Sequence, residues 1–488
     1  MEFHWQTLDI SQVMHERGHD VEIFVIECEE DIHIPGKPSV SMQVHRYTAY
    51  HEVADIFGVE LFKYFSVWIH GKISIKDDAQ VLNRYKKKGE GRVRVVCYNP
   101  LLMRQAVIVE AVRTPIGRAH REKGVFREVR ADDLSALTMQ ALLARAHIPP
   151  ELVEDVYWGC ARQTEEQGYN IARQAALIAG FPVEVCGVTV NRNCGSSLEA
   201  INQAARSIAT RCNEVFIAGG VEHMDHLPMG SGFNPSPKLL ARHGVPAFTM
   251  GLTAENLASL YGISREEQDA FAIQSHHRAA AATDTGAFQR EIVPMRGKDT
   301  EGKPIVVTQD QGIRRDTTME ALGALQPAFV KNGGTVTAWN SSQTSVGAAA
   351  ALLMSSEKAK ELGLKPKASI RSAAVAGVDP FVMGLGPVPA VRRALERAGL
   401  TLADIDVIEL NEAFAAQALV VMRELGLDPA KVNIRGGAIA LGHPLGASGA
   451  RIAATLISLM EDRRAQFGLV AMCIGGGQGI ATIFEKTE

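Results

Sequence analysis

The stretches NRNCGSSLEAINQAARSIA (191–209) and LGHPLGASGARIAATLISLM (441–460) follow one pattern, and this pattern decides the predicted fold. Each combines a strand end, a turn of Gly and Ser, and a helix with small or apolar side chains on almost every face. A helix that is apolar all round is buried, and small side chains let two helices approach closely. We therefore expect two helices, about 196–210 and 448–460, to form a central layer between two sheets.

The segments ahead of these stretches also match each other. A helix is expected at 133–148, followed by PPELVED and the strand VYWGC (156–160), and a helix at 388–400 is followed by the strand DVIELNEAF (406–414). Apolar strands that alternate with helices indicate βαβ units and a largely parallel sheet. The sequence thus predicts an α/β protein built from two duplicated halves.

The composition of the chain changes near residue 104. The first 104 residues are rich in His, aromatic and charged side chains and end near the basic run NRYKKKGEGRVR (83–94). We interpret 1–104 as an extension outside the core with no assigned fold, 105–365 as the first half, and 366–488 as the second half. A polar insertion at about 224–345, with a helical pattern at 264–283, reads as a functional loop domain within the first half.

The composition excludes several classes of protein. Among 488 residues, 46% are apolar and 22% are charged, which is typical of a globular protein. The net charge is −4, and no run of Lys and Arg is long enough to suggest a nucleic-acid surface. The most apolar early stretch, 53–73, is interrupted by charges and His70, so we expect no membrane span. Seven cysteines without a CxxC pair favour free thiols in a reducing cytoplasm over disulfides or a zinc site.

Two residues of the paired turns fit acyl transfer, which needs a thiolate, a base and donors aimed at a carbonyl oxygen. Cys194 follows the strand VCGVTV and begins a helix, where backbone N–H groups and the helix dipole stabilise a thiolate. His443 lies among glycines at the matching turn, which suits a ring aimed into a shared cleft. Taken singly, each residue also fits an inert core cysteine or a structural histidine.

Two further residues end apolar strands of the second half. Cys473, in AMCIGGGQGIA (471–481), precedes glycines whose N–H groups are free to bind an oxyanion. Asn411 ends the strand DVIEL and could hold a water molecule or donate its amide into the same cleft. A lone asparagine at this place is more often a turn residue, so the combination of motifs carries the argument.

The motifs NRNCGSSLEA, NEAFAAQ, GGAIALGHPLGASGAR and CIGGGQG, in that order, resemble the thiolase family across residues 105–488. The resemblance implies a thiolase-like αβαβα layered core of two similar halves and a loop domain that holds coenzyme A, in a homodimer or homotetramer. It implies reversible thiolytic cleavage of 3-ketoacyl-CoA to acetyl-CoA and a shortened acyl-CoA. Coenzyme A is then a substrate, and neither a permanently bound cofactor nor a metal is required.

The resemblance also implies residue roles. Cys194 would carry the acyl group, His443 would take its proton, and Cys473 would act as acid and base on the substrate carbon or the CoA thiol. His443 and a water held by Asn411 would form one oxyanion site, and the N–H groups of Cys194 and Gly475 the other. Three more positions match the family: Ser342 as the pantetheine contact, and Met383 and Phe414 as the lining of the acyl pocket.

Two positions depart from the family pattern. Trp339 stands in TAWN where the family has glycine, and its ring could narrow the CoA tunnel or turn outward. Val346 replaces an aspartate that could cap a helix expected over GAAAALLM (347–354), at a cost of about 0.5 to 2 kcal/mol if it capped. Neither position belongs to the four candidate catalytic residues.

Other activities compete with thiolysis. Within the superfamily, a ketoacyl synthase would have another residue in place of Cys473 and a hydroxymethylglutaryl-CoA synthase would rely on a glutamate, so Cys473 favours a thiolase. A thiolase-like protein that binds acyl-CoA or lipid without turnover is an alternative from another class. The phrase AGGVEHMDHLPMG (218–230) resembles degradative enzymes of fatty acid β-oxidation more than biosynthetic acetoacetyl-CoA thiolases, and a degradative enzyme would suit a partner with hydratase and dehydrogenase activities.

Overall fold

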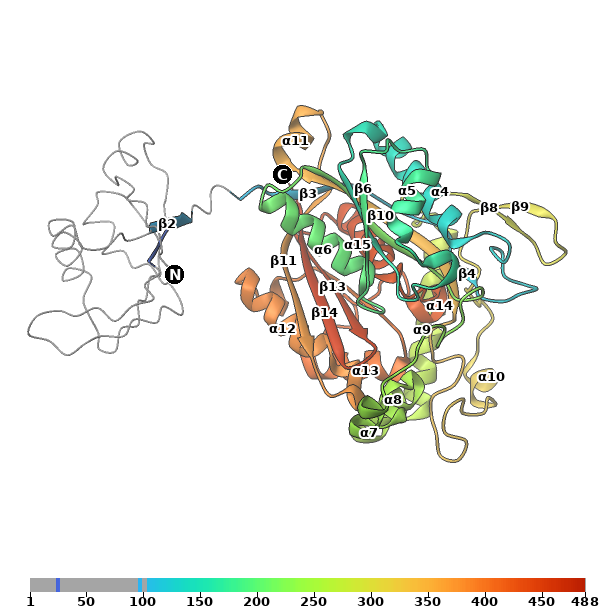
Figure 1. Cartoon of the computed structure of the whole chain (residues 1–488). Helices are drawn as coiled ribbons and strands as arrows, with labels where there is room; N and C mark the ends of the chain where they lie inside the picture. The colour runs from blue at the N-terminus through green and yellow to red at the C-terminus, as the bar shows by residue number, and fades with distance from the viewer. Residues whose placement is uncertain (1–22, 27–94, 99–102, 488) are drawn as a thin grey trace, which may run out of the picture. The chain divides into compact units, whose positions relative to one another are not determined.

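The structure, a computed structural model, describes residues 23–26, 95–98 and 103–487. The chain divides into two compact units, residues 1–104 and 105–488. In the first unit, strand β1 (Ile23–Ile26) pairs antiparallel with β2 (Val95–Tyr98) (Figure 1). The elements described below belong to the second unit, and the predicted domain boundaries at 104 and 365 stay predictions.

A ten-stranded sheet runs through the described part of the second unit. It consists of two half-sheets, joined where Ala368 and Ser369 of β11 pair with Ile108 and Val107 of β3. The order along the sheet is β12 (Val407–Leu410), β13 (Phe467–Ile474), β14 (Gln478–Glu485), β11 (Ala368–Gly377), β3 (Ala106–Arg113), β10 (Ser345–Ser355), β7 (Val215–His223), β5 (Asp155–Gly159) and β6 (Cys186–Val190), with β4 (Gly117–Arg118) paired to β10.

The strand directions correct one expectation, because the sheet is mixed rather than largely parallel. Strand β5 is parallel to β6 and β7, and β12 is parallel to β13, as expected of βαβ units. The other pairings are antiparallel: β10 with β3, β4 and β7, β11 with β3 and β14, and β13 with β14. A short turn suffices to join the antiparallel pair β13 and β14, and β10 enters the sheet after the long insertion, so neither follows the βαβ pattern.

Strand β10 corrects a second expectation, because 347–354 was predicted as a helix. Its alanines favour a helix by intrinsic propensity, yet all eleven residues are buried in a strand between β3 and β7. Helices α4 (Ala131–Ala146) and α15 (Ser448–Arg463) both contact it, and a strand covered by helices reads as an unbroken apolar run. Val346 therefore caps no helix; it is fully buried and pairs with Gly117 and His223.

Five layers build the core, as expected for the fold. Helix α6 (Ser196–Ala209) and α15 lie against each other in the interior and contact strands of both half-sheets (Figure 1). On the outer faces, α4 and α5 (Ile171–Ile178) cover the first half-sheet, and α12 (Pro387–Ala398), backed by α13 (Ala415–Leu425), covers the second. The N-terminal ends of α6 and α15 therefore lie side by side, and Ala450 donates its backbone N–H to Ser197 Oγ at 2.9 Å.

Apolar burial holds this central layer together. Leu198, Ile201 and Ile208 of α6 share one buried cluster with Leu456 and Ile457 of α15. Each such side chain contributes about 1.5 to 3 kcal/mol when it leaves water. Small residues occupy the closest approach, since a Cβ at Gly449 would overlap with the backbone of Leu198.

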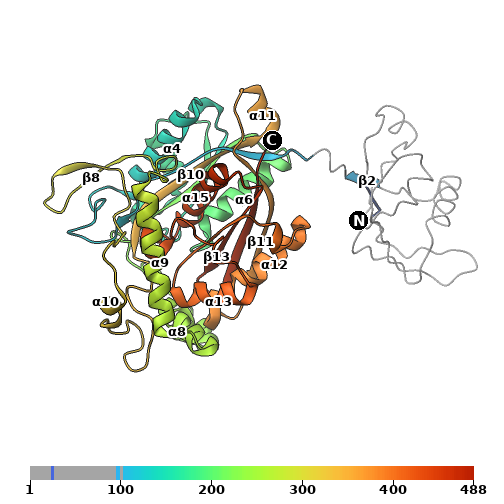
Figure 2. The same cartoon turned by 180° about the vertical axis from the view of Figure 1, so that it is seen from behind.

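The insertion between β7 and β10 forms the loop domain, and its helix α9 begins with a capping box between Ser264 and Glu267. Figure 2 shows α9 beside α13, and α9 also contacts α14 (Ala438–Leu441), which ends just before His443. No helix within the described residues is long and apolar enough to cross a membrane. The elements of the insertion are α7 (Pro237–His243), α8 (Met250–Tyr261), α9 (Arg265–Asp284), β8 (Met295–Lys298), β9 (Pro304–Val307) and α10 (Met319–Gly323).

Candidate active site

The four candidate catalytic residues lie on four turns that the fold brings together. Cys194 lies between β6 and α6, and Asn411 directly follows β12. His443 lies between α14 and α15, and Cys473 is the penultimate residue of β13. Asn411 contacts His443, while Cys194 packs against Leu445 and is close enough to Cys473 to influence its ionisation.

Cys194 is half-buried beside Ala161, Met224 and Leu445. Burial raises the pKa of its thiol, and the nearby Glu222 carboxylate raises it further, while the Gly475 N–H that points at the sulfur opposes both. The net pKa is above the ordinary value, because burial outweighs the backbone N–H groups of Gly475 and Cys194, which lower the pKa. Cys194 rests as a thiol and needs a base.

His443 has the hydrogen-bonding pattern of a neutral base. Its Nδ1 lies 2.6 Å from Ser448 Oγ, and that hydroxyl donates to Pro444 O at 2.8 Å. Because the hydroxyl hydrogen is already used, Nδ1 must carry the ring proton and donate to Ser448, which leaves a lone pair on Nε2. Burial, followed by the positive charge of Arg451, lowers the pKa of His443 to about 3.

Asn411 faces this lone pair with its amide nitrogen, at 3.3 Å from His443 Nε2. Its side-chain oxygen is buried and accepts no hydrogen bond within the described part of the chain. A buried amide oxygen without a donor is costly. The site therefore suits a bound water or substrate group that donates to Asn411.

Cys473 is 1% exposed and packs in a buried cluster with Met383 and Phe414. Burial raises the pKa of its thiol strongly, and the neighbouring Cys194 raises it further. The group therefore rests protonated beside an apolar wall. A thiol in this state can give a proton to a carbon atom and take one back from a second thiol.

The Gly475 turn and the Ser342 segment frame the cluster. Gly475 begins a Gly-Gly-Gly turn whose next two residues have φ of +85° and +80°, where glycine is favoured, and Asn193 Nδ2 donates to Gly475 O at 3.1 Å. Ser342 is half-buried and donates its backbone N–H to Ala413 O at 3.0 Å, next to Phe414. The first bond connects the glycine turn to the neighbour of Cys194, and the second connects the loop domain to the segment that follows Asn411.

Trp339 packs into the interface between the loop domain and the core. Its ring is half-buried against the cluster of Ala272, Leu322, Ala415 and Ile439. The guanidinium of Arg314 lies over the ring, 3.8 Å from its centroid. The Trp339 side chain thus has packing partners, although the family pattern has a glycine at this position.

Three residues of the site were missed by sequence reasoning. Ser448, which orients His443, was available as the only hydroxyl side chain in HPLGASGAR, five residues after the histidine. Glu222 is the last residue but one of a buried strand, and Arg451 is a cation in a helix of small residues. A charged residue in either apolar setting indicates a buried polar partner. Arg451 is 1% exposed, and its three guanidinium nitrogens have no hydrogen-bond acceptor within the described residues.

Arg451 belongs to a group of buried charged residues close to His443. Its charge interacts with Glu409, whose pKa burial raises to about 8, and with the Arg113 group. Arg113 Nε is 2.6 Å from Glu291 Oε1, and its Nη1 is 2.7 Å from Asp310 Oδ1. These charges are shielded from water, and of this group Arg451 acts on His443 through a medium of low dielectric constant.

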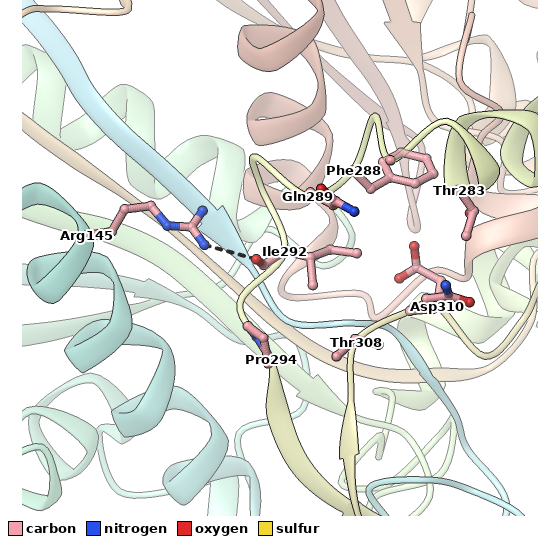
Figure 3. Close-up of a pocket in the computed structure, with 10 residues that line it drawn as sticks. Arg145, Thr283, Phe288, Gln289, Ile292, Pro294, Thr308 and Asp310 are labelled. Carbon is pink, nitrogen blue, oxygen red and sulfur yellow. Dashed lines mark hydrogen bonds between the residues drawn. The ribbon is translucent and has the colours of Figure 1, made fainter.

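A cavity of about 380 Å³ lies apart from this cluster (Figure 3). Its lining contains Arg145, Phe288 and Ile292, and none of the candidate catalytic residues. Arg145 donates to Arg290 O and Ile292 O, and Asp310 is bound to Arg113. The charged groups of this cavity are therefore already paired, and the chemistry belongs to the Cys194 cluster.

Within the described residues, no group of three or more His, Cys, Asp or Glu side chains is arranged to hold a metal ion. The donors of the Cys194 cluster are instead N–H groups and thiols.

Comparison with known proteins agrees with the geometry. The N-terminal domain of thiolase matches residues 106–357 and the C-terminal domain matches 364–486. A 3-ketoacyl-CoA thiolase of Shewanella denitrificans is 58% identical over 388 residues, covering 79% of this chain and all of the relative, and that of Idiomarina loihiensis is 55% identical over the same coverage.

Solved structures give the same result. The acetyl-CoA acetyltransferase of Bacillus anthracis is 41% identical with a TM-score of 0.72, covering 79% of this chain and 99% of that one. Human mitochondrial 3-ketoacyl-CoA thiolase is 39% identical with a TM-score of 0.72, covering 79% of this chain and all of that one. The family models and the relatives together establish that this chain belongs to the thiolase family.

Proposed function

We propose that this chain cleaves 3-ketoacyl-CoA with coenzyme A, reversibly, to give acetyl-CoA and a shortened acyl-CoA through a thioester on Cys194. The observation that carries the proposal is the state of His443. Its Nδ1 donates to Ser448 Oγ, and its Nε2, which keeps a lone pair, lies 3.3 Å from the Asn411 amide nitrogen. A neutral base beside a half-buried thiol and a fully buried thiol is what cysteine acyl transfer requires.

In the first half-reaction, His443 Nε2 accepts the proton of the Cys194 thiol. The thiolate attacks the keto carbon C3 of the substrate and forms a tetrahedral alkoxide. Collapse of the alkoxide breaks the C2–C3 bond, leaves the acyl group on Cys194, and releases the C2 carbanion of acetyl-CoA as an enolate. Cys473 gives its proton to C2, so acetyl-CoA leaves and Cys473 remains as a thiolate.

In the second half-reaction, the Cys473 thiolate takes the proton of the incoming CoA thiol. The CoA sulfur attacks the thioester carbon, and the acyl group moves from Cys194 to CoA. The proton held on His443 returns to Cys194, and both cysteines end as thiols. Bonds and protons balance without an external oxidant or reductant.

Two sets of donors would stabilise the negative oxygens. We assign the N–H groups of Cys194 and Gly475 to the oxygen on C3, because the Gly475 N–H already points at the nucleophile. We assign protonated His443 and a water on Asn411 to the thioester enolate, because Asn411 Oδ1 is buried without a donor. Ser342 would contact the pantetheine arm of the substrate.

The acyl pocket would be apolar. Met383 and Phe414 pack around Cys473, and the half-exposed Phe329 meets Phe414 edge to face at 6.2 Å. The 3-ketoacyl-CoA thiolases of Shewanella denitrificans and Idiomarina loihiensis, at 58% and 55% identity, are more similar in sequence than the solved acetyl-CoA acetyltransferase at 41%. We therefore favour the degradative reaction of fatty acid β-oxidation over the biosynthesis of acetoacetyl-CoA.

A degradative enzyme needs a supply of 3-ketoacyl-CoA. This compound forms by hydration of an enoyl-CoA and oxidation of the resulting alcohol, so we propose a partner with hydratase and dehydrogenase activities. We place the reaction in the cytoplasm, because the five cysteines in the described ranges are free thiols, as expected in a reducing compartment.

We propose further that the active chain is at least a homodimer. Strand β6 ends the sheet path, and apolar side chains stand exposed around it: Val188 is 42% exposed, Val183 71% and Ile178 49%. A second copy that pairs with this edge would cover both the open backbone and the apolar surface. Analytical ultracentrifugation would then show a dimer or tetramer, and Val188→Lys would weaken it.

A thiolysis assay tests the activity. Purified protein, mixed with coenzyme A and 3-ketoacyl-CoA substrates of short and long acyl chain, should remove the enolate absorbance of each substrate. Loss confined to acetoacetyl-CoA would favour the biosynthetic alternative. Tight acyl-CoA binding with no CoA-dependent loss would identify a binding protein and contradict the proposal.

A further inference from the structure

Glu222 stands at the end of β7, fully buried, and accepts four hydrogen bonds. Its Oε1 accepts from Arg162 N at 3.1 Å and Gln167 Nε2 at 2.7 Å. Its Oε2 accepts from Ala161 N at 3.0 Å and Gly446 N at 2.8 Å. Burial raises the pKa of Glu222, and the four hydrogen bonds oppose that rise. Four donors around two oxygens favour an ionised carboxylate, which accepts at both oxygens and donates at neither.

The four donors belong to both halves of the catalytic cluster. Gly446 lies three residues after His443 and two before Ser448, so its N–H fixes the turn that carries the base. Ala161 packs against Cys194 and Leu445, so the bond to its N–H fixes the surface on which the nucleophile rests. One carboxylate thus connects the support of Cys194 to the turn of His443.

Glycines keep this junction tight. A Cβ at Gly159 would overlap with the backbone of Ser197 at the start of α6, and one at Gly220 would overlap with Gly446 O. A Cβ at Gly446 would lie 2.8 Å from Cys160 Cα and 2.9 Å from Glu222 Oε2, both closer than real contacts. Backbones of β5, β7 and the His443 turn are therefore in direct contact around the carboxylate.

The carboxylate also acts on the nucleophile by its charge. Glu222 raises the pKa of the Cys194 thiol, second among the causes that do so only to burial. A negative charge fixed near the sulfur opposes a resting thiolate. The proton is then held until His443 can take it in the complex with substrate.

We propose that Glu222 is a positioning residue for thiolysis, which holds the Cys194 support and the His443 turn in register through its four hydrogen bonds. It does not touch the substrate. This inference rests on the proposed thiolase reaction and adds a residue that sets how the two duplicated turns meet. A misplacement of about 1 Å between reacting groups can reduce a rate about 100-fold, so loss of these hydrogen bonds should strongly reduce kcat.

The test is Glu222→Gln in the full-length protein. The amide keeps the shape but turns one NH2 group toward donors, so either the Gly446 and Ala161 pair or the Arg162 and Gln167 pair loses its acceptor. We expect kcat for thiolysis to fall about 10- to 100-fold, with KM for 3-ketoacyl-CoA little changed. Alkylation of Cys194 by iodoacetamide should shift to lower pH, because the opposing charge is gone.

These two expected results run in opposite directions. A more acidic thiol together with a slower turnover would show that alignment with the base, rather than the nucleophile itself, has been lost. Glu222→Asp keeps the charge and should keep the alkylation profile at its original pH, with turnover between those of wild type and Glu222→Gln. The matched control is Asp132→Asn, another buried carboxylate of the same half, which bonds to Arg130 away from the cluster.

A purely structural role gives a different pattern. If Glu222→Gln loses activity only in proportion to its folded fraction, or keeps wild-type kcat, the proposal is wrong. If Glu222→Gln fails to fold, Glu222→Asp decides: full wild-type turnover per folded molecule would overturn the positioning role. Failure of wild-type protein to cleave any 3-ketoacyl-CoA would instead reject the reaction itself, independently of Glu222.

Discussion

The two turns that begin α6 and α15 are built alike but hold opposite groups. Both helices begin with a serine, Ser196 and Ser448, and each hydroxyl donates to a backbone carbonyl of the preceding turn. The first turn presents the half-buried thiol of Cys194, and the second holds the buried imidazole of His443. Duplication thus supplies two equivalent helix starts that differ in burial. In the proposed mechanism, the more exposed Cys194 meets the substrate and the buried His443 receives the proton.

The fourth residue of each helix carries the contrast further. Glu199 of α6 is paired with Arg192 at 3.3 Å and Arg206 at 2.5 Å, so its charge is neutralised locally. Arg451 of α15 has no bonded acceptor within the described residues, and its charge lowers the pKa of His443. At this position the helix that follows Cys194 has a carboxylate paired with two arginines, whereas the helix that follows His443 has a buried arginine that lowers the pKa of His443.

The largest expected effect comes from removing the base of the second turn. His443→Ala should lower kcat/KM for thiolysis about 100- to 10,000-fold, because it removes the base that we propose for Cys194. Steady-state kinetics measure this, and exposed His277→Ala serves as the matched control. A loss smaller than tenfold would mean that Cys194 gives its proton to another group.

A smaller effect is expected from making the two turns electrostatically alike. Arg451→Met removes the cation that lowers the pKa of His443, so this pKa should rise from about 3 toward its ordinary value of 6.5. The rate of Cys194 acylation should then fall at acidic pH where the wild-type rate does not, by about tenfold for each pH unit below the new pKa. Arg463→Met, on the exposed last turn of the same helix, is the control.

The same shift affects stability, with a defined sign. The folded-state pKa of His443 lies below 6.5, so the unfolded chain binds the proton more readily between pH 6.5 and 3, and stability falls as pH drops through that window. Raising the pKa narrows the window, so this part of the acid destabilisation should shrink in Arg451→Met. An acid unfolding curve and acylation profile identical to wild type would show that Arg451 does not act on His443.

Trp339→Gly tests the region beside both turns rather than the turns themselves. The ring packs against Leu322 and Ile439 and under Arg314, so its loss should lower the free energy of unfolding by about 1 to 3 kcal/mol. Thermal unfolding measures this loss. KM for CoA substrates and the alkylation rate of Cys194 should change little, and a clearly lowered KM would show that the ring narrows the CoA path.

The smallest effect is expected from residues 1–102. Both turns, the loop domain and the four candidate catalytic residues lie after them, and both thiolase domains match from residue 106 onward. A chain beginning at Met103 should keep its oligomeric state and turnover number. Lost thiolysis in a shortened chain that retains its circular dichroism spectrum would give the extension a part in the CoA site or the subunit interface.

Local sequence was sufficient to find both turns, because the same pattern of strand end, Gly/Ser turn and helix of small side chains occurs twice in the chain. It failed for β10, where an alanine run favours a helix and only the cover by α4 and α15 makes a strand. It also missed Glu222 and Arg451, since their roles depend on partners such as Gly446 and His443 that are far away in the chain. Long-range burial, rather than local pattern, determines these charges.

The division of labour between the two cysteines is the central claim. Cys473→Ala should remove the acid that protonates the acetyl-CoA carbon and the base for CoA, yet leave Cys194 and His443 in place. Incubated with acetyl-CoA and analysed by mass spectrometry, this variant should retain an acetyl group on the peptide that holds Cys194 while its overall turnover is lost. An unlabelled Cys194 in Cys473→Ala, with acetyl found on Cys473 in the wild-type protein, would reverse the two roles and contradict the account.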